Sequence, residues 1–344
     1  MWRDRGPAMR VAGAVLVVVV VSLVVAGLAG QRPESPATST VAGASPGSVR
    51  GTTLWVRVPT GKVEVVVGDP VATIPAGRTE SGESIAAAPG MRFLPVGVSV
   101  GAGLGLRGLG VDFSEAPRAA LTLRLAGEGF DLPAVVPTDG LYLRIPSAAI
   151  EPEQLQLVAE YDGVTQTVDG TGERERGAAA ALYGLPGDVP AQPCHRGWRA
   201  RPRATVVVSC SAYVQSLPYL PELGWAGRAE PGALWSVAAV TSVLESASLP
   251  ARGGSSGACT LVLPGSGRLQ LDGEAPRSVL TSVARSIPLG QEVRTTGAFL
   301  TVGVDRARLR IVRDVPCLAR GSRFDLRLVR ARAVDLGAGA GRAR

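Results

Sequence analysis

Short apolar runs separated by turn residues recur along most of the chain. Alternation and β-branched residues predict strands in the first half, at 54–58, 63–67, 93–100, 120–125, 141–145 and 155–161. The second half predicts further strands at 205–210, 234–243, 260–263, 269–271, 297–304, 309–312 and 324–329. Gly-Asp-Pro, Ala-Pro-Gly and Thr-Asp-Gly sequences between the runs predict turns. The pattern predicts an all-β protein. Two segments, 172–184 and 278–287, instead favour a short helix or a connection.

The two halves share an order of features. The run Val63–Val67 precedes a long loop, a Pro-Gly turn at Pro89 and a long predicted strand. The run Thr205–Val208 precedes a loop of similar length, a Pro-Gly turn at Pro231 and another long strand. This order predicts two related β-sandwiches in tandem; the alternatives are one large irregular β structure or two unrelated ones.

Part of this pattern resembles the secreted immunoglobulin-like modules of actinobacterial envelope proteins. The matching positions are Gly90, Phe93, Val96, Val98, Val100, Asp139, Gly140 and Tyr142, within residues 55–165, with a fainter match over 200–335. The resemblance implies two tandem immunoglobulin-like β-sandwiches and no catalytic residue.

The N-terminus has the features of an export segment. Arg3, Arg5 and Arg10 precede an uncharged run, 11–30, whose length as a helix matches a hydrocarbon core of about 30 Å. This predicts a single transmembrane helix with the later residues outside the cytoplasm. The small residues Gly27 and Ala29 leave signal cleavage, and hence secretion, as the alternative.

These patterns together predict that the chain has seven parts. These are a cytoplasmic N-terminus (1–10), the membrane segment (11–30), a Pro/Ser/Ala-rich stalk (31–49), the first sandwich (50–171), a linker (172–190), the second sandwich (191–336) and a disordered tail (337–344).

Four cysteines lie in the second half, namely Cys194, Cys210, Cys259 and Cys317. An even number in an exported protein predicts two disulfides. Three connectivities are possible. Pairing Cys194 with Cys210 and Cys259 with Cys317 is preferred because each pair closes a loop between predicted strands. A zinc site is the alternative, but the spacing contains no C-x-x-C motif.

Composition restricts the chemistry. The apolar fraction of 46% excludes wholesale disorder, and the absence of Asn excludes N-glycosylation sequons. His195 is the single histidine, which excludes a multi-histidine metal site. The Asp and Glu residues are scattered, so no catalytic pair stands out. The sequence therefore predicts no catalytic residue, no metal and no cofactor.

Two concentrated features favour binding. Residues 303–344 contain eleven arginines against four aspartates, and Arg306, Arg308 and Arg310 alternate along a predicted strand. Arginine engages phosphate groups in a bidentate manner, which favours anionic wall polymer or lipid, while export disfavours nucleic acid. The loop 216–232 carries Tyr219 and Trp225, which either contact a partner or close the end of a sandwich.

These features predict a non-catalytic, membrane-anchored extracytoplasmic protein that binds an envelope protein or an anionic envelope component. The alternatives are a tethered or secreted hydrolase that uses acidic residues, and a structural subunit of an envelope complex.

Overall fold

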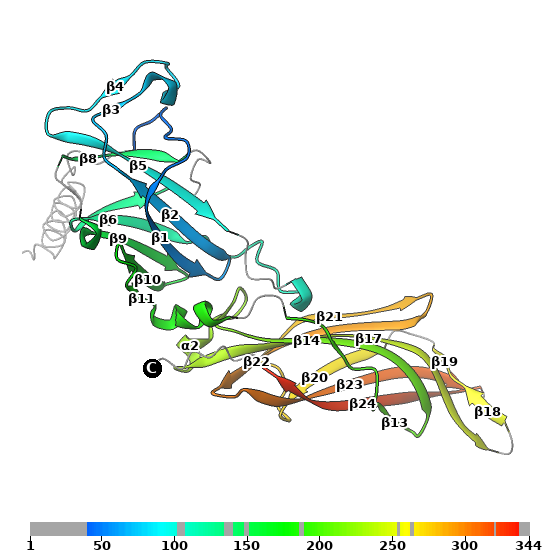
Figure 1. The fold of residues 1–344 in the computed structure, drawn as a ribbon. Coiled ribbons are helices and arrows are strands. Elements are labelled where there is room, and N and C mark those ends of the chain that lie inside the picture. The colour runs from blue at the N-terminus through cyan, green and yellow to red at the C-terminus, as the bar shows by residue number, and fades with distance from the viewer. Residues whose placement is uncertain are drawn as a thin grey trace, which may run out of the picture.

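Antiparallel strands dominate the computed structural model and confirm the predicted all-β fold (Figure 1). The structure describes residues 40–101, 107–133, 140–147, 151–185, 189–252, 255–261, 265–319 and 321–336. No sheet among these residues contains strands from both halves of the chain. We therefore distinguish a first module, residues 40–185, from a second module, residues 189–336.

The first module contains two main antiparallel sheets. One has the strand order β1-β2-β5-β8, with β1 (Gly51–Val58), β2 (Gly61–Gly68), β5 (Met91–Val100) and β8 (Leu141–Pro146). The other has the order β11-β10-β9-β6-β7, with β6 (Ala120–Leu125), β7 (Glu128–Leu132), β9 (Leu155–Tyr161), β10 (Val164–Asp169) and β11 (Arg174–Glu175). The shorter elements are β3 (Thr73–Ile74), β4 (Ile85–Ala86) and the 3-10 helices η1 (Ala76–Arg78), η2 (Arg107–Leu109), η3 (Pro152–Gln154) and η4 (Gly177–Gly184).

Side-chain alternation explains why the two sheets pack together. Leu54 and Val56 of β1 are buried, and the residues between and beside them are more exposed. Leu155 and Leu157 of β9 follow the same alternation in the other sheet. All four belong to one continuous apolar cluster, so the core lies between the sheets.

The second module also contains two antiparallel sheets, with longer strands. One has the order β12-β14-β17-β22-β21, with β12 (Gln192–Pro193), β14 (Thr205–Leu217), β17 (Ala233–Arg252), β21 (Ser278–Ile287) and β22 (Gly290–Val302), and β18 (Ser255–Ala258) pairs with β17. The other has the order β13-β24-β23-β19, with β13 (Arg199–Arg201), β19 (Thr260–Leu261), β23 (Arg306–Ala319) and β24 (Ser322–Asp335), and β20 (Ser266–Leu271) also pairs with β23. The loop between β14 and β17 holds β15 (Tyr219–Leu220), β16 (Gly224–Trp225) and helix α2 (Ala226–Ala229).

Two disulfides join elements of the second module. Cys194 bonds to Cys210, with Cα atoms 4.8 Å apart, and Cys259 bonds to Cys317, with Cα atoms 5.6 Å apart. The preferred pairing is therefore confirmed, and all four cysteines are consumed. Two disulfides fit an oxidising, extracytoplasmic compartment.

The repeated Pro-Gly turn occupies equivalent places in the two modules. Gly90 and Gly232 adopt φ angles of +79° and +77°, which a glycine tolerates without a Cβ clash. Each turn leads into a strand that pairs antiparallel with the preceding long strand, β5 with β2 and β17 with β14. The shared order seen in the sequence thus reflects a shared arrangement of two neighbouring strands.

The helix predicted at 278–287 is wrong, because this segment forms β21. Its apolar residues recur at helical spacing, but its backbone hydrogen-bonds to β22 along its length. Helical spacing in a short segment rich in Ser, Thr and Val is weak evidence for a helix, and pairing with a neighbouring strand overrides this local preference.

The limits of the first module are wider than predicted. The sequence predicts residues 40–49 to be part of the stalk. In the structure, however, the backbone N–H of Val41 donates to the Tyr142 carbonyl, and the backbone N–H of Ser45 donates to the Arg78 carbonyl. The sequence predicts residues 177–184 to be part of the linker. In the structure, however, η4 places Ala179 and Leu182 in the apolar core of the first module. Both segments belong to the folded first module.

The predicted N-terminus and membrane segment, the stalk residues 31–39 and the tail 337–344 lie outside the described residues. Within the described part of the chain, no helix is long and apolar enough to cross a membrane.

Candidate binding trough on the second module

The outer face of the sheet formed by β13, β24, β23 and β20 is rich in arginine. On β23, Leu309 and Ile311 point into the core, so Arg308 and Arg310 point outward. On β24, Leu326 and Leu328 point inward, and Arg327 between them faces solvent. The alternation therefore places Arg308, Arg310 and Arg327 on the outer face.

This face is hollowed into a trough with a volume of about 1090 Å³. Val329 and Ala331 of β24 form its floor, because their side chains are small. Arg199 lies beside Val329 on β13, and Arg310 lies beside Ala331 on β23. Long arginines on two strands thus flank short side chains on the strand between them. The lining residues are Gly197, Arg199, Arg201, Pro202, Asp272, Gly273, Arg308, Arg310, Asp314, Asp325, Arg327, Val329 and Ala331.

The trough has uneven charge pairing. At one end Asp314 accepts hydrogen bonds from Arg268 at 2.5 Å and from Arg327 at 2.7 Å. The guanidiniums of Arg199, Arg201 and Arg308 form no ion pair with any described residue. These three guanidiniums are therefore available to an anion, and one of them, Arg201, lies beside the paired Arg327 on the neighbouring strand.

The three arginines predicted from the sequence have different surroundings. Arg308 and Arg310 line the trough, where Arg310 also donates to the side chain of Gln270. Arg306 lies outside it and forms an exposed ion pair of 2.9 Å with Asp335. The sequence missed Arg199 and Arg201 because they lie more than a hundred residues earlier. Their Arg-Ala-Arg alternation is the only signal that marks them as residues of one strand face.

Tyr219 and Trp225 do not face solvent. They are 3% and 2% exposed and pack against Tyr161 of the first module, with ring centroids 5.2 and 6.3 Å from the Tyr161 ring. The Trp225 indole N–H donates to the Tyr161 carbonyl at 3.1 Å. Burial raises the pKa of the Tyr161 and Tyr219 phenols, so both side chains stay neutral. The expectation that this loop meets a partner is corrected, because the loop joins the two modules.

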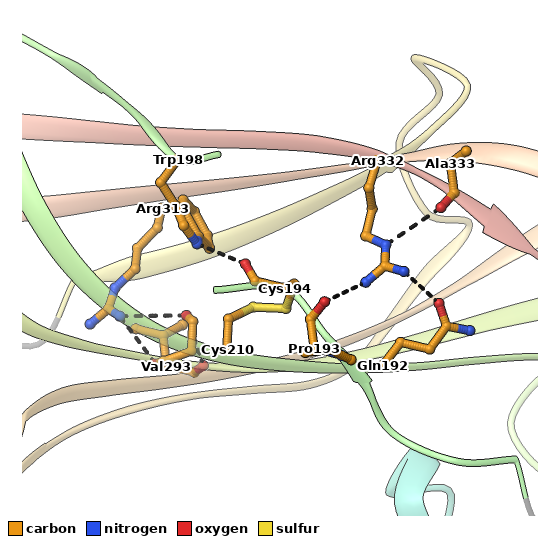
Figure 2. Close-up of a disulfide and its surroundings, with 10 residues drawn as sticks. Gln192, Pro193, Cys194, Trp198, Cys210, Val293, Arg313, Arg332 and Ala333 are labelled. Carbon is orange, nitrogen blue, oxygen red and sulfur yellow. Dashed lines mark hydrogen bonds between the residues drawn. A yellow bond between two sulfur atoms is a disulfide. The ribbon is translucent and has the colours of Figure 1, made fainter. Parts of the chain in front are cut away.

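The opposite face of the same sheet carries a buried arginine. Arg313, which Figure 2 shows beside the Cys194–Cys210 disulfide, is 1% exposed and reaches across the core. It donates to the carbonyls of Ser242 and Gln291. Burial lowers its pKa to about 10. Figure 2 also shows Arg332, which donates to the Pro193 carbonyl at 2.8 Å and so ties β24 to β12. These contacts link the two sheets of the second module on the side opposite the trough.

Few chemically reactive side chains gather in the described part of the chain, apart from the aspartates of the trough. No group of three His, Cys, Asp or Glu residues within them is placed to hold a metal ion. His195 is exposed and follows Cys194 of the disulfide. Three aspartates line the trough, Asp272, Asp314 and Asp325, and of these Asp272 accepts the backbone N–H of Arg308.

Comparison with known proteins gives no family. No protein-family model matches the chain, and no curated protein is significantly similar to it in sequence.

Proposed function

We propose that this protein is a non-catalytic, extracytoplasmic docking protein whose trough binds a phosphate-bearing anionic polymer of the cell envelope. The observation that carries the proposal is that the guanidiniums of Arg199, Arg201 and Arg308, which form no ion pair with any described residue, lie on the two sides of a floor formed by Val329 and Ala331. A planar guanidinium matches the geometry of a phosphate group and donates two hydrogen bonds to it.

The shape of the trough favours an extended ligand. Its floor follows β24, and alternate residues on a strand are about 6.8 Å apart. Arg199 and Arg201 form one wall at this spacing, and Arg308 and Arg310 form the other. A linear chain that carries repeated negative charges therefore meets successive arginines, whereas a single small anion meets one or two.

The position of the trough favours a polymer over the lipid surface. The proposed anchor, residues 11–30, precedes the first module in the chain, and the trough belongs to the second. The first module separates the trough from the anchor along the chain. A membrane tether at the N-terminus then leaves the trough free to reach wall material.

The proposed architecture is a pair of immunoglobulin-like sandwiches. An immunoglobulin domain pairs strands A-B-E-D in one sheet and C-F-G in the other. In the second module, the order β14-β17-β22-β21 and the set β20, β23 and β24 fit this arrangement. In the first module, β2-β5-β8 and β7-β6-β9-β10 fit A-B-E and C′-C-F-G, with β1 as an additional edge strand. The strand orders support the resemblance found in the sequence.

A hydrolase is the competing proposal, because aspartates line the same trough. Glycoside hydrolysis needs one carboxyl group to protonate the leaving oxygen. Both oxygens of Asp314 already accept hydrogen bonds from guanidiniums, which favours a structural role for this carboxylate. If the partner is an envelope protein, or if this chain is a structural subunit, binding should survive removal of the phosphate polymer.

The test is sedimentation of the detergent-solubilised full chain with isolated cell envelopes over a salt series. The double variant Arg308→Gln/Arg310→Gln should weaken binding by about tenfold or more, since each lost charged hydrogen bond contributes about 1.5–3 kcal/mol. The control Arg306→Gln/Arg323→Gln removes the same charge from the same face outside the trough and should bind nearly as well.

Two further arms separate the ligands. Envelopes stripped of phosphate polymer should lose the binding, and vesicles of anionic phospholipid should not restore it. Binding that ignores salt, or that falls equally in the control variant, contradicts the proposal. Release of sugar from the envelopes by the intact chain, lost on Asp325→Asn, supports the hydrolase instead.

A further inference from the structure

The two sheets of the second module leave an opening along one side of the sandwich. Strand β20 borders one sheet at this side and β21 borders the other, since each has a single strand partner among the described residues. Val279 of β21 lies opposite Gly297 of β22 and therefore faces inward, on the same face as the buried Thr295. Its side chain is nevertheless 56% exposed. An apolar side chain that faces inward but remains exposed marks a gap between the sheets.

This gap opens into a pocket with a volume of about 510 Å³, which lies within the range of small-molecule sites. The lining combines apolar side chains with basic ones at the side that borders the trough. Such a lining favours a ligand that has both an apolar and an anionic part. The apolar lining residues are Leu269, Ala275, Pro276, Val279 and Val312.

Thr295 supplies a buried hydroxyl to this pocket. The residue is 4% exposed, and its Oγ1 has no hydrogen-bond partner among the described residues. Gly267 of β20 leaves this hydroxyl uncovered, because a Cβ at that position would lie 2.5 Å from the Thr295 Oγ1. A buried hydroxyl without a partner is destabilising, so it points to a ligand atom that completes it. A carbonyl oxygen is such an acceptor.

Arg310 lies where the pocket meets the trough, since it lines both. It donates one hydrogen bond to the side chain of Gln270 and forms no ion pair with any described residue. A guanidinium has five N–H donors, so most of them remain for an anion. Arg268 and Arg327 also line the pocket, but both are paired with Asp314. Arg310 is therefore the residue best suited to hold the anionic part of a ligand.

We propose that this pocket binds an acyl ester that carries a phosphate group. The phosphate accepts hydrogen bonds from Arg310, whose planar fork matches its geometry. The ester carbonyl accepts the hydrogen bond that the Thr295 hydroxyl lacks. The acyl chain packs against Leu269, Pro276 and Val279, which removes exposed apolar surface from water.

Calorimetric titration of the full chain in phosphatidylcholine nanodiscs tests the inference with short, water-soluble probes. The hexanoyl ester of glycerol phosphate should bind at least about tenfold more tightly than glycerol phosphate, because its chain buries apolar surface. It should exceed hexanoyl glycerol by a similar factor, because that probe lacks the anion. The hexyl ether of glycerol phosphate lacks the carbonyl and should bind about fivefold more weakly than the ester. Empty nanodiscs correct for partition of the probes into lipid.

Variants of the pocket assign the contacts. Thr295→Val keeps the shape of the side chain without the hydroxyl, so it should weaken the ester about fivefold and leave the ether unchanged. Gly267→Ala covers the hydroxyl with a methyl group and should weaken both probes. The control Thr281→Val makes the same change on β21 at a position outside the pocket lining and should bind both probes as the unaltered chain does. Circular dichroism verifies that each variant is folded.

Equal binding of the ester and of glycerol phosphate overturns the proposal. A Thr295→Val variant that binds the ester normally, or that loses the ether as well, also overturns it. Because Thr295 does not line the trough, either result leaves the docking proposal standing.

The same chemistry occurs in a single-chain phospholipid and in an acylated unit of a phosphate polymer. Displacement of the ester by the lipid extract of cell envelopes supports the first source, and displacement by their water-soluble polymer supports the second. Displacement by neither fraction contradicts the proposal.

Discussion

Trp225 is the residue through which the stability of the joint between modules is most directly tested. It belongs to the second module, is 2% exposed, and lies in the apolar cluster of the first module. Truncation of a buried Trp to Ala costs about 3–5 kcal/mol through lost burial and the remaining cavity. Within this total, the hydrogen bond to the Tyr161 carbonyl contributes about 1 kcal/mol, and each edge-to-face ring pair contributes about 0.5–1.5 kcal/mol.

We therefore expect Trp225→Ala to lower the free energy of unfolding by about 3–5 kcal/mol, a large part of the 5–15 kcal/mol typical of a domain. Because the lost contacts with Tyr161 cross the joint, the two modules should unfold in separate transitions. Trp225→Phe retains a ring but loses the hydrogen bond, and should cost about 1–2 kcal/mol.

The assay is denaturant unfolding followed by circular dichroism, with amide hydrogen exchange to locate the loss. Exchange should accelerate at the β9–β10 turn, next to Tyr161. Trp55→Ala is the matched control, since Trp55 is half-buried and stacks on Tyr183 within the first module. A single unchanged transition for Trp225→Ala, or a loss below about 1 kcal/mol, refutes the reasoning.

Three further predictions concern the second module. Replacing Cys259 and Cys317 by serine should lower the free energy of unfolding by about 4 kcal/mol, since their disulfide closes a loop of 58 residues. Replacing Cys194 and Cys210 should lower it by about 3 kcal/mol, since their loop has 16 residues. Denaturant unfolding of both variants checks the order. Arg313→Met should lower the free energy of unfolding by about 1.5–3 kcal/mol, because it removes the charged hydrogen bonds to the carbonyls of Ser242 and Gln291. Arg313→Lys should also lower it, because an ammonium is more strongly hydrated and lacks the planar fork; thermal unfolding of both variants measures the losses. Binding of envelopes by the unaltered chain should fall steeply with salt, and the trough variant should show a shallower salt dependence in the same sedimentation assay.

The sequence alone determined the features that depend on near neighbours. Alternation with a period of two predicts most strands and the outward face of β23, because a strand turns successive side chains to opposite sides. The Pro-Gly turns at Pro89 and Pro231 follow from local backbone preferences. The sequence predicts two disulfides and favours the observed pairing, but it leaves three connectivities open, and the structure decides between them.

Only the tertiary structure decided the features that depend on strand pairing. Arg199 and Arg201 reach the trough because β13 pairs with β24, a contact between residues far apart in the sequence. Trp225 is buried because the first module covers it, and no pattern within 216–232 distinguishes such a plug from an exposed anchor. Segment 278–287 becomes a strand because β22 offers it backbone partners. Local propensity fixes which residues share a face, but the free energy of long-range pairing and burial decides which faces meet.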